Sequence, residues 1–172
     1  SILTVTYCPD CFRGCLKTTK QDTKMKNKTF TASIALMALI APSYAAESED
    51  IIKYRISVME AYGGHMSAAS RIVRGKVDFT DQLQLHADSM KDIAGTVDKL
   101  FPEDSDFGDT RAKEEVWSKA KEFAQSVKDN QQAAADFSSS VAGGDKAAIA
   151  ASFKKLADSC KSCHEEFRTE EE

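Results

Sequence analysis

The chain has 172 residues, 29% of them charged, and a formal net charge of −4 at pH 7. This length suffices for one domain with one hydrophobic core. Residues 46–172 alone carry 17 basic and 25 acidic residues. An acidic surface of this kind argues against a nucleic-acid partner, whose phosphates require Lys and Arg, and favours basic protein partners.

Residues 25–45 have the three parts of a cleavable signal peptide. Residues 25–28 begin with Met and carry two lysines, residues 30–41 are short and mostly apolar, and residues 43–45 place small residues before a cleavage site. The apolar stretch is too short to span a bilayer. We therefore predict export to the periplasm and a mature chain, residues 46–172, without a membrane span.

Residues 1–24 precede Met25, which we take as the initiator, so we expect them to be translated upstream sequence outside the working protein. They contain Cys8, Cys11 and Cys15 in the spacing C-x-x-C-x-x-x-C. The alternative is a small metal site, but no His or fourth Cys accompanies these three. The mature chain then keeps two cysteines, both near its C-terminus.

The first two helices are expected at residues 49–74, behind a Ser48 cap, and at residues 80–100, behind a Thr80 cap. The break between them falls at Gly75. The expected inward residues of the first are Ile52, Arg55, Met59, Tyr62, Met66, Ala69 and Val73, and those of the second are Leu83, Met90, Ile93, Val97 and Leu100.

The third helix is expected at residues 111–141, behind Thr110, and the fourth begins behind Asp145, after a break at Gly143-Gly144. No strand-like alternation persists, and short connections favour antiparallel neighbours. The sequence therefore predicts an all-α, antiparallel four-helix bundle. The expected inward residues are Val116, Trp117, Ala120, Phe123, Ala124, Val127, Ala134 and Phe137, then Ile149, Phe153, Leu156, Cys160, Cys163 and Phe167.

The fourth helix carries Cys160-Lys161-Ser162-Cys163-His164, the C-x-x-C-H pattern typical of covalent haem attachment. On a helix, Cys160, Cys163 and His164 project from one face, so both thiols can form thioethers while the imidazole binds the iron. A thioredoxin-like site would need a βαβ pattern, and a zinc site a second ligand pair. The motif predicts one covalently attached haem c per chain.

A haem would bring two propionates and a second axial position into the bundle. Arg55 could pair with a propionate or extend into solvent from the helix end. Met59, one turn further, could bind the iron, block its sixth position or simply fill the core. His86 is another candidate axial ligand, although a histidine at the edge of a helix's inward stripe more often points its polar end to solvent. His65 lies outside the inward stripe of its helix and is expected at the surface.

Residues 51–168 resemble the cytochrome c′ family. The resemblance rests on Lys53-Tyr54-Arg55 with Met59, Gly64-His65-Met66, Val73-Arg74-Gly75-Lys76, Glu115-Val116-Trp117 and residues 160–168. It implies covalent haem, His164 as the only strong protein ligand, and a homodimer that pairs through the first two helices.

By the same likeness, Arg55 matches the family's propionate-side arginine, Met59 its distal pocket residue and Arg168 the arginine beside the proximal histidine. Arg168 follows His164 by one turn, which also places it near the proximal haem face. The alternative for Arg168 is a solvated charge that complements the C-terminal end of the helix dipole.

The resemblance leaves two functions open. High-spin members have five-coordinate iron that binds NO or CO, whereas low-spin relatives use a Met at the Met59 position as sixth ligand and carry electrons. The first helix resembles the high-spin type more closely, so we expect a redox-active, gas-binding cytochrome with an unidentified redox partner. We expect no enzymatic activity, because the distal candidate is a thioether and not a His or Arg suited to O–O cleavage. The alternative is a low-spin electron carrier with Met59 on the iron.

Overall fold

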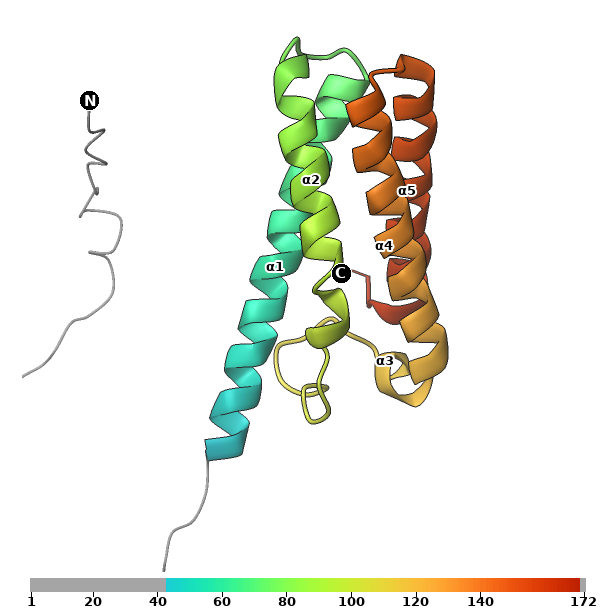
Figure 1. The fold of residues 1–172 in the computed structure, drawn as a ribbon. Coiled ribbons are helices and arrows are strands. Elements are labelled where there is room, and N and C mark those ends of the chain that lie inside the picture. Colours follow the sequence, from blue (N-terminus) through green and yellow to red (C-terminus); the bar gives the residue numbers. More distant parts are fainter. Residues whose placement is uncertain (1–42, 171–172) are drawn as a thin grey trace, which may run out of the picture. The chain divides into compact units, whose positions relative to one another are not determined.

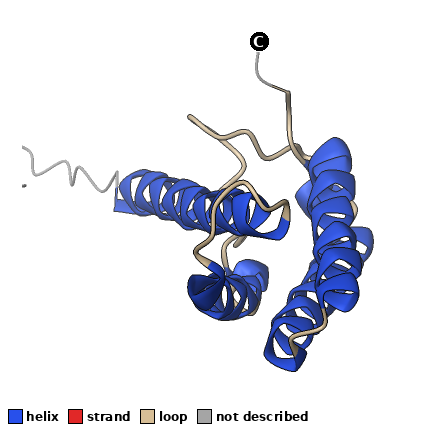
Figure 2. Ribbon diagram, turned by 90° about the horizontal axis from the view of Figure 1, so that it is seen from above, coloured by secondary structure: helices blue, strands red, loops and turns tan. Residues whose placement is uncertain are grey.

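The structure is a computed structural model that describes residues 43–170. Within this range every regular element is helical (Figure 2), apart from an isolated β-bridge between Ala112 and Arg168. The elements are α1 (Ser43–Val73), η2 (Thr80–Gln82), α2 (Leu83–Ala94), η3 (Val97–Lys99), α3 (Glu115–Ser118), α4 (Ala120–Gly143) and α5 (Lys146–Phe167). Residues 1–24 and nearly all of the predicted signal peptide lie outside the described residues.

The four long helices α1, α2, α4 and α5 lie side by side, and each runs antiparallel to the next long helix along the chain (Figure 1). Helix α2 packs against α1 and α4, and α4 packs against α5, whereas α1 and α5 approach each other less closely. The predicted all-α, antiparallel four-helix bundle is therefore confirmed.

Two tight turns close one end of the bundle. Gly75 and Gly144 have φ values of 62° and 73°, which glycine adopts without steric cost. The amide of Gly144 donates to the carbonyls of Ser140 and Val141 at 3.2 and 3.0 Å, which ends α4. The Asp145 side chain then accepts from the amide of Ala148 at 2.7 Å and starts α5, as predicted.

Several helix boundaries differ from the prediction. Ser48 lies inside α1, and the helical turn at Thr80 has no side-chain cap. The second helix ends at Ala94, before a glycine of low helix propensity, and continues only as the short turn η3.

The third predicted helix begins four residues late and is broken. Residues 111–114 are not helical, and Lys119 interrupts the helix with φ −113° and ψ 47° between α3 and α4. Ala120 and Ala124, expected in the core, are exposed. Alanine has a small apolar surface, so the free-energy cost of exposing it is low.

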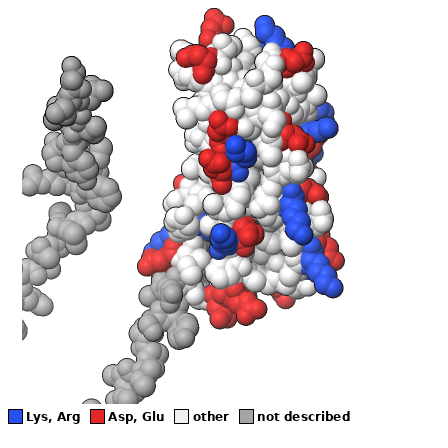
Figure 3. Space-filling model, in the orientation of Figure 1, with Lys and Arg blue, Asp and Glu red and all other residues white. Residues whose placement is uncertain are grey.

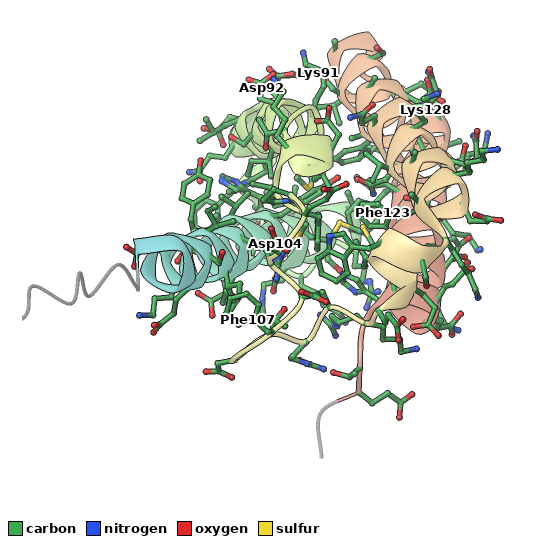
Figure 4. All side chains as sticks on the ribbon, turned by 90° about the horizontal axis from the view of Figure 1, so that it is seen from below. Lys91, Asp92, Asp104, Phe107, Phe123 and Lys128 are labelled. Atoms are coloured by element: carbon green, nitrogen blue, oxygen red, sulfur yellow. The ribbon has the colours of Figure 1, made fainter. Side chains whose placement is uncertain are left out.

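The buried apolar side chains form two clusters. The first lies toward the two tight turns and includes Phe137, Leu156 and Met90. The second, here called the loop-end cluster, contains Val97, Val116, Phe123, Val127 and Phe167, with Met59, Phe101, Ala112, Trp117 and Cys163 packed against it. Figure 4 looks along the bundle from this end and shows Phe123 pointing inward from α4. Its ring centroid lies 4.9 Å from that of Phe101 and 5.2 Å from that of Phe167.

Candidate haem site

Helix α5 places Cys160, Cys163 and His164 on the wall of one cavity of about 550 Å³. This volume is within the range of about 300–1,000 Å³ that is usual for cofactor sites. The remaining walls come from α1, α4, α3 and the segment before it. The apolar side chains of the wall are Ile56, Met59, Met66, Val97, Phe101, Val116, Phe123, Val127 and Phe167.

The two cysteines are free and half-buried. Burial raises the pKa of Cys160, and it raises the pKa of Cys163 to about 11, with smaller contributions from Cys160 and Glu166. A thioredoxin-like pair requires a thiol whose pKa is lowered, so these thiols do not have that character. In residues 43–170, no three His, Cys, Asp or Glu side chains are grouped to hold a metal, which also argues against the zinc alternative.

The imidazole of His164 lies near the end of α5, between two arginines. His164 is exposed as a whole residue, but desolvation of its ring at the cavity wall lowers its pKa, and the positive charges of Arg168 and Arg111 lower it further. This shift favours the neutral ring, which is the form that binds iron. Arg111 was not predicted at the site, because the segment that carries it was expected to be helical.

A short segment after α5, residues 168–170 and here called the strap, pairs with the segment before α3. This pairing brings the two arginines to the cavity. After α5, Arg168 adopts extended backbone angles and forms the bridge with Ala112. The amide of Lys113 donates to the carbonyl of Phe167, and the amide of Thr169 donates to that of Arg111, both at 2.9 Å. Arg168 is exposed, and both it and Arg111 line the cavity.

Arg55 is only 3% exposed, so its side chain does not extend into solvent. Its Nη1 donates to the carbonyl of Leu100 at 3.2 Å and to Oγ of Ser105 at 3.0 Å. Its Nη2 donates to the carbonyl of Ser105 at 3.0 Å and to Oγ1 of Thr110 at 2.7 Å. The guanidinium carbon also lies 4.7 Å from the ring centroid of Phe101. Thr110, predicted to cap a helix, instead holds this arginine.

Met59 and Tyr62 bring α1 to the same cavity. Met59 is half-buried and packs against the loop-end cluster. The Tyr62 hydroxyl donates to Oδ1 of Asn130 at 3.0 Å, and Nδ2 of Asn130 donates to Oγ of Ser159 at 3.0 Å, which links α1, α4 and α5. Asn130 was not predicted at the site, because a single asparagine on a helix has no characteristic spacing. Tyr54, by contrast, is 64% exposed.

His86 is not part of the cavity wall. Its Nδ1 lies 3.0 Å from Nδ1 of His65, and burial, followed by the charge of His65, lowers its pKa. The geometry thus argues against the alternative in which His86 binds the iron. His65, expected at the surface, is half-buried beside it.

A C-x-x-C-H motif on a helix that faces a cofactor-sized cavity in an antiparallel bundle defines a four-helix c-type haem protein. The profile of the family described as "Cytochrome C'" matches residues 50–168. This chain belongs to the cytochrome c′ family, whose members carry covalently attached c-type haem.

The curated and solved relatives agree with this assignment. A cytochrome c′ of Rhodospirillum rubrum is 31% identical over 147 residues, which are 85% of this chain and 100% of that protein. A ferrous variant of cytochrome c prime from Alcaligenes xylosoxidans with bound NO is 25% identical, with a TM-score of 0.67, over 72% of this chain and 97% of the other. A carbon monoxide-bound variant from the same organism is 26% identical, with a TM-score of 0.68, over 73% and 98%.

Among residues 43–170, no helix is both long and apolar enough to cross a membrane.

The contacts of Arg55 predict a local effect on stability. We expect Arg55→Met to lower the free energy of unfolding by about 2–4 kcal/mol, because it leaves buried acceptors of Leu100 and Ser105 without their donor. Hydrogen exchange within residues 101–110 should accelerate at the same time. Tyr54→Ala, on the adjacent exposed position, is the matched control and should leave both measurements nearly unchanged. Equal effects of the two substitutions would contradict this role of Arg55.

Proposed function

We propose that this chain is a periplasmic, gas-binding cytochrome c′ that holds one haem through thioethers to Cys160 and Cys163, with His164 on the iron. The observation that carries the proposal is that these three side chains lie on the wall of one cavity, whose other walls are largely apolar. When bound, the haem supplies the iron that takes up a diatomic gas and exchanges one electron. The chain's role is binding and electron transfer, without an enzymatic reaction.

Gas binding is supported by the similar structures with NO and with carbon monoxide. Within this chain, Met59 is the side chain on α1 that we assign to the distal position. Its packing against the loop-end cluster supports a steric role, because a thioether engaged in core contacts is restrained from moving to the iron. Met59 therefore limits access to the sixth position and does not occupy it.

The arginines supply the charge that a haem's propionates require. Arg55 is buried, and no carboxylate in the described part of the chain forms an ion pair with it. Its four terminal N–H bonds all go to neutral acceptors, so its positive charge stays uncompensated in a low-dielectric environment. A propionate near Arg55 would offset that charge. We assign Arg168 to the proximal face, beside His164.

We further propose that the protein forms a homodimer through α1 and α2. One large apolar side chain supports this surface, since Leu85 on α2 is 62% exposed. Figure 3 shows charged side chains of both signs scattered over one face of the bundle, with uncharged areas between them. The acidic excess of residues 46–172 favours a basic redox partner.

The role of Met59 can be tested by absorption spectroscopy of the haem-loaded protein, ferric and ferrous, with and without carbon monoxide. We expect a high-spin spectrum and ready carbon monoxide binding, and Met59→Ala should remain high-spin and bind the gas faster, because a steric block is removed. His164→Ala should lose the normal axial bond. A low-spin spectrum that is indifferent to carbon monoxide, and that Met59→Ala converts to high-spin, would instead make Met59 a ligand and the protein an electron carrier.

The dimer surface can be tested by light scattering coupled to size-exclusion chromatography. Leu85→Glu should shift the protein from dimer to monomer, because it places a charge in the apolar contact. Phe107→Glu is the matched control, since Phe107 is also exposed, at 46%, but lies in the loop before α3. A monomeric unsubstituted protein, or a dimer unaffected by Leu85→Glu, would contradict the proposed surface.

Export can be tested by intact-mass analysis of the haem-loaded protein from a periplasmic fraction. The expected mass is that of a chain beginning at Ala46 with one haem, because cleavage is predicted after residues 43–45. A periplasmic protein that retains Cys8 would overturn both the proposed cleavage and the proposed upstream origin of residues 1–24.

A further inference from the structure

Two of the chain's three histidines lie outside the haem cavity and face each other between α1 and α2. Nδ1 of His65 lies 3.0 Å from Nδ1 of His86, and the ring centroids are 5.3 Å apart at an interplanar angle of 59°. Both side chains are half-buried in the single chain, which leaves part of each accessible there to a small solute. The haem function proposed above makes no use of this pair.

The distance between the two nitrogens suits bidentate binding of a metal ion. Imidazole nitrogens lie about 2.0–2.1 Å from a bound zinc ion, so two ligands at 90–109° to each other are about 2.8–3.4 Å apart. The observed separation of 3.0 Å falls within that interval. Imidazole is also the side-chain ligand that copper, zinc and nickel share.

We propose that His65 and His86 together chelate one divalent transition-metal ion through their Nδ1 atoms. Since no group of three His, Cys, Asp or Glu side chains is placed to hold a metal in the described range 43–170, the other coordination positions are filled by water. With two neutral nitrogen ligands the preference follows the general order for divalent metals, and Cu²⁺ binds more tightly than Zn²⁺ or Ni²⁺.

Binding needs only a local rearrangement of the two rings. In the metal-free pair one ring donates its Nδ1 proton to the other, and that proton moves to Nε2 of the same ring by exchange with water when the metal binds. Each ring then rotates so that its lone pair points at the ion and not at the opposite nitrogen. No net proton is released from a neutral pair, and no electron is transferred.

The backbone around the pair is already held in place. Tyr62 and Ala69 on α1 are buried within one turn of His65, and Ala87 and Met90 on α2 are buried within about one turn of His86. The helices therefore present both imidazoles without having to move.

The test is Cu²⁺ binding to the haem-loaded ferric protein, measured by equilibrium dialysis with metal analysis and by electron paramagnetic resonance. We expect one additional Cu²⁺ per chain that is lost in the double substitution His65→Gln/His86→Gln. Each single substitution should weaken binding at least about tenfold, because loss of a direct ligand costs no less than loss of a supporting contact. The copper signal should show coupling to two imidazole nitrogens.

Asp92→Asn is the matched control, because it removes an exposed carboxylate that points outward from the same helix α2 (Figure 4) and should leave Cu²⁺ binding unchanged. The haem spectrum and carbon monoxide binding should be the same in all these variants, so the result is independent of the proposed gas-binding function. Equal Cu²⁺ affinity in the double variant and the unsubstituted protein, or a signal without two-nitrogen coupling, would overturn the proposal.

Discussion

The buried guanidinium of Arg55 is the interaction on which the loop end of the bundle depends. A charged group with 3% exposure is tolerated only if its donors are satisfied, and the segment from Leu100 to Thr110 folds around it for that purpose. The same segment supplies the carbonyl of Pro102, to which the indole of Trp117 donates at 3.0 Å. One arginine on α1 therefore orders the loop, and the loop positions the start of α3 and one wall of the cavity.

The opposite edge of the cavity is held by the strap after α5. The bridge between Ala112 and Arg168 joins the segment before α3 to the end of the helix that carries the haem motif. This arrangement explains why residues 111–113 are not helical, since backbone groups of Arg111 and Lys113 pair with residues 167–169 and not within a helix. Helices α1 and α5 pack less closely than the other neighbouring helices. The hydrogen bonds of Arg55 and the Ala112–Arg168 bridge therefore keep the cavity between these helices at a defined size.

The fold and the attachment motif were predictable because their signals are local. The four periodic segments, the Gly144 turn and the Asp145 cap each depend on a few adjacent residues, and the motif's i, i+3, i+4 spacing fixes its common face. The strap was not predictable, because the bridge joins segments more than fifty residues apart and overrides a helical pattern. Arg111 and Asn130 were missed for the same reason, since only tertiary contacts bring them to the cavity.

Helix α1 faces the haem cavity with one side and α2 with another, so the haem site and the histidine pair are separate in space. Met59 and His65 are six residues apart, about 240° around the helix axis, so the first reaches the cavity beside α5 while the second reaches α2. The buried Tyr62 lies between them and ties α1 to Asn130. An ion held between His65 and His86 would therefore join α1 to α2 without entering the haem cavity, and it would act on the haem from a distance, for example through the position of α1.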